Sequence, residues 1–390
     1  MKYDFDEIID RRNTYAEKYA ELEKLYGNGD AIPMWVADMD FKAARPVIDA
    51  IRERTENGIF GYTVRPEAHY DAVCDFQKRR KNWDIDKDLM SFSLGVMPSI
   101  CMMVRELTGP EDKVIIQTPV YRPFFNAVKE AHRELLENPL KEVGGRYYMD
   151  YADLEEKAKQ GAGYLILCSP HNPVGRVWTK EELERLGDIC LRYGIKVIAD
   201  EIHSDLILRG STHTVFSSVS EELRKITTTC IAASKTFNLA GLQSSIIVFP
   251  DAGTKRNFDA AWARLHIECN NCMSMAGTQA AFEYGEEWLD QLLEYVGDNV
   301  DLAVDYFNRY VPQIRPIRPE GTYLIWLDCR KLGLSGRQLT EFMVNKAGVA
   351  MSAGTYFGKN GEGFMRMNVA CPKAQVEKAL RQIRAAVEEK

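Results

Sequence analysis

The sequence lacks the features that would point to a membrane, an export route or nucleic acid. None of its apolar runs approaches the ~18 residues that a membrane-spanning helix needs. The chain starts Met1-Lys2-Tyr3-Asp4-Phe5, without the apolar core of a secretory signal, so we expect a cytoplasmic protein. Its net charge of −7 lacks the basic excess of nucleic-acid-binding proteins. We therefore expect neither a membrane nor a nucleic-acid partner.

Cysteines are also sparse and unordered. The nine cysteines are scattered and odd in number, which favours free thiols over a disulfide framework. Cys269-Asn270-Asn271-Cys272 is a CxxC motif without a second pair. We interpret its two cysteines as ordinary loop or helix residues and predict no metal site.

The length and composition allow two domains. The chain has 390 residues, of which 45% are hydrophobic and 27% charged, as in an ordinary soluble globular protein. It shows no internal repeat and no low-complexity linker. A large core is therefore expected.

The middle of the chain alternates short apolar runs with amphipathic stretches. This alternation is typical of βα units around a mostly parallel sheet, with helices on both faces. We predict an α/β fold with a three-layer αβα large domain. The predicted strands are Met90–Leu94, Lys113–Gln117, Tyr164–Cys168, Lys196–Ala199, Thr228–Ala233 and Ser244–Phe249.

One predicted helix between two of these strands has clear ends. Thr179 and Glu182 form a capping box, and Gly194 is placed to end the helix. After about residue 285 the pattern changes to a long helix (Glu286 to Tyr310), a strand (Thr322–Leu327) and a final helix (Ala374–Lys390). We expect a smaller α+β domain there.

The chain is therefore divided into three parts. Residues 1–48 are expected to join the smaller domain, 49–284 to form the large cofactor-binding domain, and 285–390 to form the small C-terminal domain.

Unusual polar residues follow the predicted strands, where open parallel sheets bind ligands. Gly95 follows the first strand, and Val96-Met97-Pro98 opens a helix with proline at the first helical position. The N–H groups of this turn can hold a phosphate, although a plain βα turn explains it equally well. Tyr121 follows the second strand and can either stack on a flat ring or pack in the core.

The third and fourth strands are followed by residues that suit a ring-shaped cofactor. Asn172, between Pro170 and Pro173, is held rigidly, either to aim its amide or simply to make a turn. Asp200 ends a buried strand, where a carboxylate is costly unless it is paired, for example with a protonated ring nitrogen. A helix N-cap is the alternative role. His203 follows three residues later.

Lys235 follows the next strand in the string Ser234-Lys235-Thr236. Desolvation favours the neutral form of a lysine amine at the edge of a core, and a neutral amine forms a Schiff base with a carbonyl. These residues together predict pyridoxal 5'-phosphate as cofactor. Lys235 would hold its aldehyde, Asp200 its ring nitrogen and Tyr121 its ring face, while the Gly95 turn with Val96, Met97 and Ser234 would hold its phosphate. Asn172 and His203 would contact the ring oxygen.

Several strings of the sequence also carry a family resemblance. They are Pro33–Phe41, Gly58–Thr63, Gln117–Tyr121, Ser169–Arg176, Asp200–Leu206, Ser234–Gln243 and Arg366–Pro372. With them the chain resembles the fold-type I aminotransferase superfamily (class I/II), and within it the MalY/PatB-type cystathionine β-lyases, also called C–S lyases.

The resemblance implies further roles. Arg366 matches the arginine that binds the substrate α-carboxylate, and Ala37 lies in a segment that lines the substrate pocket. Tyr62 matches a tyrosine that reaches the cofactor phosphate of the neighbouring subunit, which implies a homodimer with shared sites. Many members have arginine where this chain has Gln243, so one phosphate-binding cation is missing.

The expected function is β-elimination from L-cystathionine or a related cysteine conjugate, with Lys235, Asp200 and Tyr121 as catalytic residues. A transaminase on the same scaffold is the alternative, and the Trp35–Phe41 and Asp200–Leu206 strings favour the lyase. Some relatives are thought to modulate transcription factors, so a regulatory binding protein with secondary lyase activity is an alternative of another class.

Overall fold

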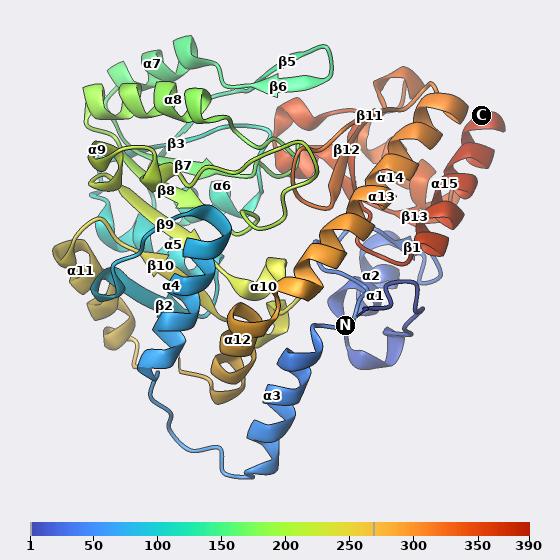
Figure 1. Ribbon diagram of the computed structural model, residues 1–390. Helices are drawn as coiled ribbons and strands as arrows, with labels where there is room; N and C mark the ends of the chain where they lie inside the picture. Colours follow the sequence, from blue (N-terminus) through green and yellow to red (C-terminus); the bar gives the residue numbers. More distant parts are fainter. Residues whose placement is uncertain (1, 268–269) are drawn as a thin grey trace.

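A seven-stranded sheet forms the centre of the larger part of the protein (Figure 1). The structure, a computed structural model, describes residues 2–267 and 270–390. The strand order is β2-β10-β9-β8-β7-β3-β4. The bounds are β2 (Met90–Ser93), β3 (Lys113–Ile116), β4 (Glu134–Glu137), β7 (Ala162–Cys168), β8 (Lys196–Asp200), β9 (Thr227–Ile231) and β10 (Ser245–Val248).

Helices cover both faces of this sheet. Side chains of one strand point alternately to opposite faces, so Leu165 and Leu167 of β7 pack under α7 (Tyr151–Lys159) and α8 (Lys180–Tyr193). Ile166, between them, belongs to the opposite core. The helices on that side are α5 (Val96–Leu107), α6 (Pro123–Glu130) and α11 (Ala252–Arg264). The expected three-layer α/β architecture is confirmed.

The direction of the strands brings four loops together. Strands β9, β8, β7, β3 and β4 are neighbours and parallel, whereas β10 runs antiparallel to both β9 and β2. The carboxyl ends of β3, β7, β8 and β9 therefore meet at one edge of the sheet. The residues that follow these strands form the site described below.

A second sheet lies towards the C-terminus. Its order is β11-β12-β15-β14, with all pairs antiparallel. The strands are β11 (Arg315–Ile317), β12 (Leu324–Asp328), β14 (Ser352–Ala353) and β15 (Phe364–Asn368). They lie with α13 (Glu286–Tyr310), α14 (Gly336–Asn345) and α15 (Lys373–Glu388). No helix in the described part of the chain is both long enough and apolar enough to cross a membrane.

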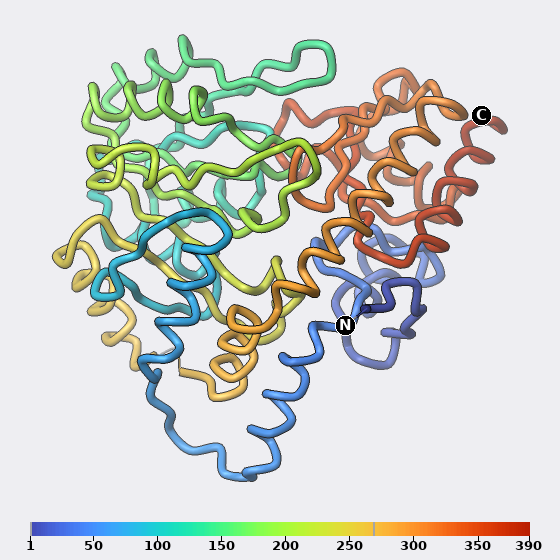
Figure 2. The backbone as a smooth tube through the Cα atoms, in the orientation of Figure 1, coloured from blue at the N-terminus to red at the C-terminus, as the bar shows by residue number. Residues whose placement is uncertain are grey.

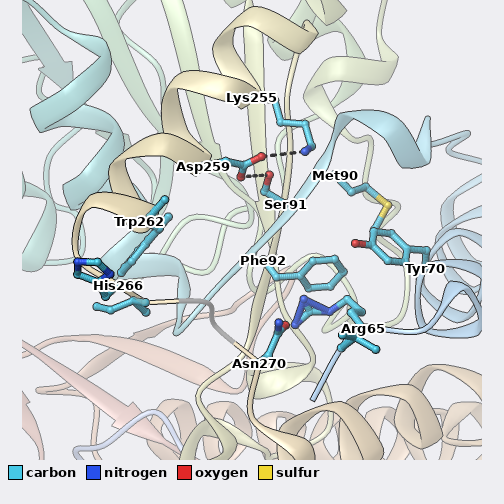
Figure 3. A pocket seen from close by; sticks show the side chains of 13 residues that line it. Arg65, Tyr70, Met90, Ser91, Phe92, Lys255, Asp259, Trp262, His266 and Asn270 are labelled. Carbon is cyan, nitrogen blue, oxygen red and sulfur yellow. Dashed lines mark hydrogen bonds and ion pairs between the residues drawn. The ribbon is translucent and has the colours of Figure 1, made fainter. Parts of the chain in front are cut away.

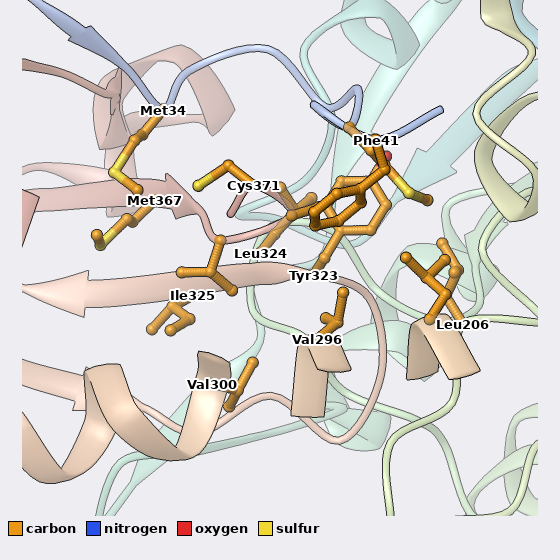
Figure 4. Packing of buried hydrophobic residues seen from close by; sticks show 14 of the residues in the cluster. Met34, Phe41, Leu206, Val296, Val300, Tyr323, Leu324, Ile325, Met367 and Cys371 are labelled. Carbon is orange, nitrogen blue, oxygen red and sulfur yellow. The ribbon is translucent and has the colours of Figure 1, made fainter. Parts of the chain in front are cut away.

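The start of the chain packs against this C-terminal part. Strand β1 (Ile32–Pro33) pairs in parallel with β13 (Val349–Ala350). Figure 4 shows Met34 and Phe41 in one apolar cluster with Val296 and Val300 of α13. These contacts support our proposal that residues 1–48 belong with 285–390, and that 49–284 form the large domain.

One segment extends away from the rest of the chain. Helix α3 (Arg45–Glu56) and helix α4 (Glu67–Lys81) are joined by residues 57–66, which lie at the lower edge of the molecule in Figure 2. This segment exposes Ile59, Phe60, Tyr62 and Val64. Helix α12 (Cys272–Tyr284) packs beside α3 and α4.

The shorter elements complete the fold. They are α1 (Glu17–Ala20), α2 (Leu22–Tyr26), α9 (Glu221–Arg224), α10 (Ala233–Thr236), β5 (Lys141–Val143) and β6 (Arg146–Tyr148).

The expected helix ends are mostly confirmed, with one correction. The capping box of Thr179 and Glu182 and the left-handed C-cap Gly194 are present in α8. Helix α5, in contrast, begins at Val96 with Gly95 as N-cap, so Pro98 is the third helical residue and not the first. Proline is tolerated there because the first four N–H groups of a helix have no intrahelical partner.

Candidate active site

A small cavity lies at the carboxyl ends of the central parallel strands. Its lining comes from the loops after β2, β3, β7, β8 and β9 and from the N-terminal segment. The residues are Ala37, Val96, Met97, Tyr121, Cys168, Asn172, Asp200, Ile202, His203 and Lys235. The structure thus brings together eight of the predicted site residues.

Lys235 is one of the residues that line this cavity. Helix α10, which carries Lys235, follows directly after β9. Nζ donates a 2.7 Å hydrogen bond to the carbonyl oxygen of Ala37. Burial lowers the pKa of Lys235 because it disfavours the ammonium; the Arg366 guanidinium acts in the same direction, while Asp38 and Asp200 act against it. The neutral amine, which can act as nucleophile or base, is therefore formed more easily here than in water.

Asp200, the last residue of β8, is a buried carboxylate without a countercharge. Only 4% of it is exposed, and Oδ1 accepts a 3.1 Å hydrogen bond from the Ile202 N–H. No described lysine, arginine or histidine lies within ion-pair distance of it, and Lys235 acts on it only at longer range. Burial raises the pKa of Asp200 to about 7; the adjacent Glu201 carboxylate acts in the same direction, while the Ile202 N–H and the Lys235 amine lower the pKa. A protonated nitrogen of a bound ring would supply the missing partner.

His203 and Tyr121 are neutral in this environment. Burial lowers the pKa of His203 to about 3, with smaller effects of Lys235 and Arg366. Its Nδ1 has no hydrogen-bond partner among the described residues. Burial also raises the pKa of Tyr121 to about 12. Both side chains can thus give or accept hydrogen bonds without carrying charge.

Arg366 on β15 reaches the site from the second sheet. Nη1 donates to Asn172 Oδ1 at 3.0 Å, and Nη2 donates to the Trp35 carbonyl at 2.7 Å. The guanidinium lies over the Phe357 ring, with its Cζ 4.9 Å from the ring centroid. Only 5% of Arg366 is exposed, and it has no carboxylate partner among the described residues, so its planar guanidinium has the geometry to bind an anion.

The segment Trp35–Phe41, which forms one wall, is held by side chains rather than by a sheet. Asn368 Nδ2 donates to the carbonyls of Val36 and Asp38, both at 2.6 Å. Asn238, three residues after Lys235, donates to those of Met39 and Phe41, both at 3.0 Å. The wall is therefore fixed both by the strand that carries Arg366 and by the segment that follows the Lys235 helix.

The Gly95 turn lies where an anion would approach the helix N-terminus. Gly95 is the N-cap of α5, and its carbonyl accepts hydrogen bonds from Ser99 N–H at 3.1 Å and Ser99 Oγ at 2.8 Å. Val96 and Met97 line the cavity. N–H groups of a first helical turn attract anions such as phosphate.

Four predicted residues are not part of this lining: Gly95 and Arg366, described above, and Ser234 and Tyr62. Ser234 lies beside Lys235 in α10 but does not line the cavity. Tyr62 is fully exposed on the protruding segment. Within one chain it makes no contact with the site. Of the CxxC cysteines, Cys269 lies outside the described residues.

Comparisons with known proteins agree with this geometry. Residues 34–383 match the family described as aminotransferase class I and II. The chain belongs to this family. It is 42% identical to the cystathionine β-lyase PatB of Bacillus subtilis (strain 168), over 98% of this chain and 99% of that protein.

Solved structures of the family have the same fold. Cystalysin from Treponema denticola, whose crystal structure contains pyridoxal 5'-phosphate, superposes with a TM-score of 0.97 at 35% identity, covering all of both chains. The pyridoxal 5'-phosphate-bound C–S lyase from Staphylococcus hominis has a TM-score of 0.91 at 33% identity, covering 99% of this chain and 98% of that one.

The residues present fit the cofactor of these structures. The buried carboxylate of Asp200, which has no ion-pair partner among the described residues, is suited to bind a protonated ring nitrogen. The buried amine of Lys235 is suited to react with an aldehyde. Nδ1 of His203 has no hydrogen-bond partner among the described residues, so it is available to bind a polar group of the cofactor or substrate. The Arg366 guanidinium is available in the same way.

A larger cavity, of about 550 Å³, lies elsewhere and has different chemistry. In Figure 3 its lysine, Lys255, points at Asp259, and the two form a 2.8 Å ion pair. Asp259 also accepts a hydrogen bond from Ser91 at 2.6 Å. An ion-paired ammonium is a poor nucleophile, so this cavity is not the active site of a family member.

Sequence reasoning missed several residues that shape the site. Cys168 and Ile202 line the cavity, and Tyr323 donates to the Ala37 carbonyl at 2.9 Å. Cys168 is the last residue of its strand, and Ile202 lies two residues after Asp200, so their positions relative to strand ends were the available signal. Nothing local marks Tyr323 or Asn368, whose partners are far away in the sequence.

Proposed function

We propose that this protein is a pyridoxal 5'-phosphate-dependent carbon–sulfur β-lyase that acts on L-cystathionine or a related cysteine conjugate. The observation that carries the proposal is the convergence of the Lys235 amine and the unpaired Asp200 carboxylate in one cavity. Similarity to PatB over nearly the whole chain supports the substrate class. The products would be a thiol, pyruvate and ammonia.

Each residue has a part in this reaction. When bound, pyridoxal 5'-phosphate supplies an electron sink for the charge that develops at the substrate α-carbon. Asp200 would keep a proton on the ring nitrogen, and Tyr121 would cover a ring face. The amine of Lys235 would remove the proton from Cα, after which the sulfur leaves from Cβ as the thiol. Asn172 and His203 would contact the ring oxygen.

Binding residues orient the substrate and the phosphate. The planar fork of Arg366 holds the α-carboxylate, with Asn172 and the Ala37 segment beside it. The Gly95 turn, Val96, Met97 and Ser234 would hold the phosphate. Gln243 lies at the left-handed C-cap of a short helix after Lys235 and supplies no cation.

We further propose that the active form is a homodimer. The segment 57–66 exposes four large apolar side chains, and Tyr62 at its centre is fully exposed. Exposed apolar groups of this kind mark interaction surfaces. Tyr62 of one subunit would then hold the cofactor phosphate of the other, which compensates for the missing cation at Gln243.

The deciding experiment follows pyruvate. Purified protein is incubated with pyridoxal 5'-phosphate and L-cystathionine in the absence of any keto acid. Pyruvate release is the expected result. Turnover only after a keto acid is added would show that the protein is a transaminase and not a lyase. The family name, aminotransferase class I and II, agrees with that alternative.

A further inference from the structure

The helix that carries Lys235 is too short to hold its own position and orientation. Helix α10 has four residues, Ala233–Thr236, and its N-cap Ala232 provides no side-chain hydrogen bond. A single helical turn is unstable by itself, because nucleation costs more than one turn of hydrogen bonds returns. The orientation of Lys235 must therefore come from contacts with other parts of the chain.

Thr236, the residue after Lys235, makes a buried contact of this kind. Its Oγ1 donates a 2.8 Å hydrogen bond to Asp205 Oδ2. Asp205 belongs to the loop that begins after Asp200, the last residue of β8, and that carries His203. One hydrogen bond thus links the loop next to the Asp200 carboxylate to the helix that carries Lys235.

Lys81 completes a three-residue chain. Lys81 ends helix α4, and its Nζ forms an ion pair and hydrogen bond with Asp205 Oδ1. Nζ also donates to Gln77 Oε1 at 2.8 Å. Three elements far apart in the sequence therefore meet next to Lys235: the end of α4, the loop after β8 and α10.

The burial of this ion pair is unusual for the end of α4. The side chains of Lys81 and Asp205 are 4% and 5% exposed, and Thr236 is fully buried. Lys78, one turn earlier, pairs with Asp84 at the surface, where the side chains are 50% and 81% exposed. A buried ion pair gains little net stability, because desolvation offsets the attraction. Its contribution here is geometric.

We propose that Thr236 is a positioning residue for Lys235, and that Asp205, itself fixed by Lys81, holds Thr236 in place. The proposal rests on the role of Lys235 given above. The apolar contact of Phe237 with Phe76 (5.7 Å between ring centroids) anchors the same helix but is not directional. The hydrogen bond to Asp205 is directional, so it sets the rotation of α10 and hence the aim of the Lys235 amine.

The step that depends most on this aim is the reaction of Lys235 with the cofactor. Nζ adds to the aldehyde carbon, one C=N bond forms and one water leaves. A displacement of about 1 Å in such a reaction costs on the order of 100-fold in rate. The same displacement slows proton removal from Cα but leaves Arg366 and its hold on the carboxylate unchanged.

The test uses full-length protein from which the cofactor has been removed. Pyridoxal 5'-phosphate is added, and the rate at which the visible absorbance of the lysine-bound cofactor appears is measured. Thr236→Val keeps the shape and removes the hydroxyl. We expect it to slow this rate and kcat by about 10- to 100-fold, with KM changed by less than about three-fold. Thr236→Ser restores the hydroxyl and both rates to near wild-type values.

A second variant separates position from stability. Lys81→Met with Asp205→Leu replaces both charges together, which proteins tolerate without loss of stability. We expect this double variant to unfold at a temperature near that of the wild type and yet to bind the cofactor slowly. Lys78→Met, which removes the surface pair of the same helix end, is the matched control and should leave both rates unchanged.

Two results would overturn the proposal. One is that Thr236→Val or the double variant attaches the cofactor and turns over substrate at wild-type rates. The other is a loss of rate in Thr236→Val that Thr236→Ser does not restore. Failure of the proposed function looks different, because wild-type protein would then develop no absorbance that depends on Lys235.

Discussion

Arg366 Nη1 donates a 3.0 Å hydrogen bond to the side-chain oxygen of Asn172, and this contact joins the second sheet to the loop after β7. The two residues are 194 positions apart. The same guanidinium holds the Trp35 carbonyl, while its buried Nε has no partner among the described residues. In the proposed function, a substrate carboxylate would meet a cation that neutral groups already orient.

Arg366→Lys is expected to weaken substrate binding. Lysine cannot reproduce the planar fork, and a lost hydrogen bond to a charged group costs about 1.5–3 kcal/mol. We expect KM for L-cystathionine to rise by about 10- to 100-fold, with a smaller change in kcat. Steady-state kinetics measure both, with the exposed Arg384→Lys as control. A KM within about two-fold of wild type would assign the carboxylate to another residue.

Lys235→Ala should remove both the absorbance of the lysine-bound cofactor and the activity. The loss of a positioned base costs about 10²–10⁴-fold in kcat, and here the attachment point is lost as well. Lys255→Ala is the matched control, because that lysine lines a cavity but is paired with Asp259. Its absorbance and activity should remain. An absorbance band that survives in Lys235→Ala contradicts the assignment.

Asp200 makes the stability of the cofactor-free protein depend on pH. Burial raises its pKa from 3.8 to about 7, so the folded state keeps a proton that the unfolded state releases. The associated stabilisation is complete below about pH 4 and is lost as the pH rises to about 7. A shift of this size corresponds to roughly 4 kcal/mol.

Urea denaturation of the cofactor-free protein at about pH 5 and about pH 8 measures this effect. The wild type should lose more stability between the two values than Asp200→Asn, which has no titrating group there. His203, whose pKa burial lowers to about 3, is common to both proteins, so its contribution cancels. Equal losses in the two proteins would show that Asp200 is not a buried, unpaired carboxylate.

Mixed dimers test whether Tyr62 acts on the neighbouring subunit. Lys235→Ala and Tyr62→Ala are each expected to be impaired as homodimers. If Tyr62 serves the partner's site, a hybrid of the two contains one site with Lys235 and Tyr62 both intact. Activity should then return when the two variants are unfolded and refolded together. A mixture that stays as inactive as its components would place Tyr62 in its own subunit's site.

The strand ends made much of the site predictable from the sequence. Lys235, Asp200, Asn172 and Tyr121 follow four neighbouring parallel strands, so an apolar run followed by a polar residue was a sufficient signal. The capping box of Thr179 was predictable because it is local. The position of Pro98 was missed by two residues, since the helix starts at the Gly95 N-cap and not at the proline.

The supporting contacts could not be predicted in the same way. Asn368 reaches Val36 across 332 residues, and Thr236 reaches Asp205 across 31. An asparagine in a strand or a threonine in a short helix gives no local pattern that names its partner. The Lys81–Asp205 pair is buried because of the way α4 packs against the rest of the chain. The hydrophobic periodicity of the sequence does not specify this packing.

The pairing of Ile32 in β1 with Val349 in β13 bears on how the protein is made. A ribosome adds about 5–20 residues each second, so more than three hundred residues separate the two strands by on the order of half a minute. During that time the N-terminal wall of the active site has no strand to pair with. All strands of the larger sheet are synthesised before Arg366 and Asn368, so the emerging chain lacks the proposed carboxylate-binding arginine until residue 366 has left the ribosome.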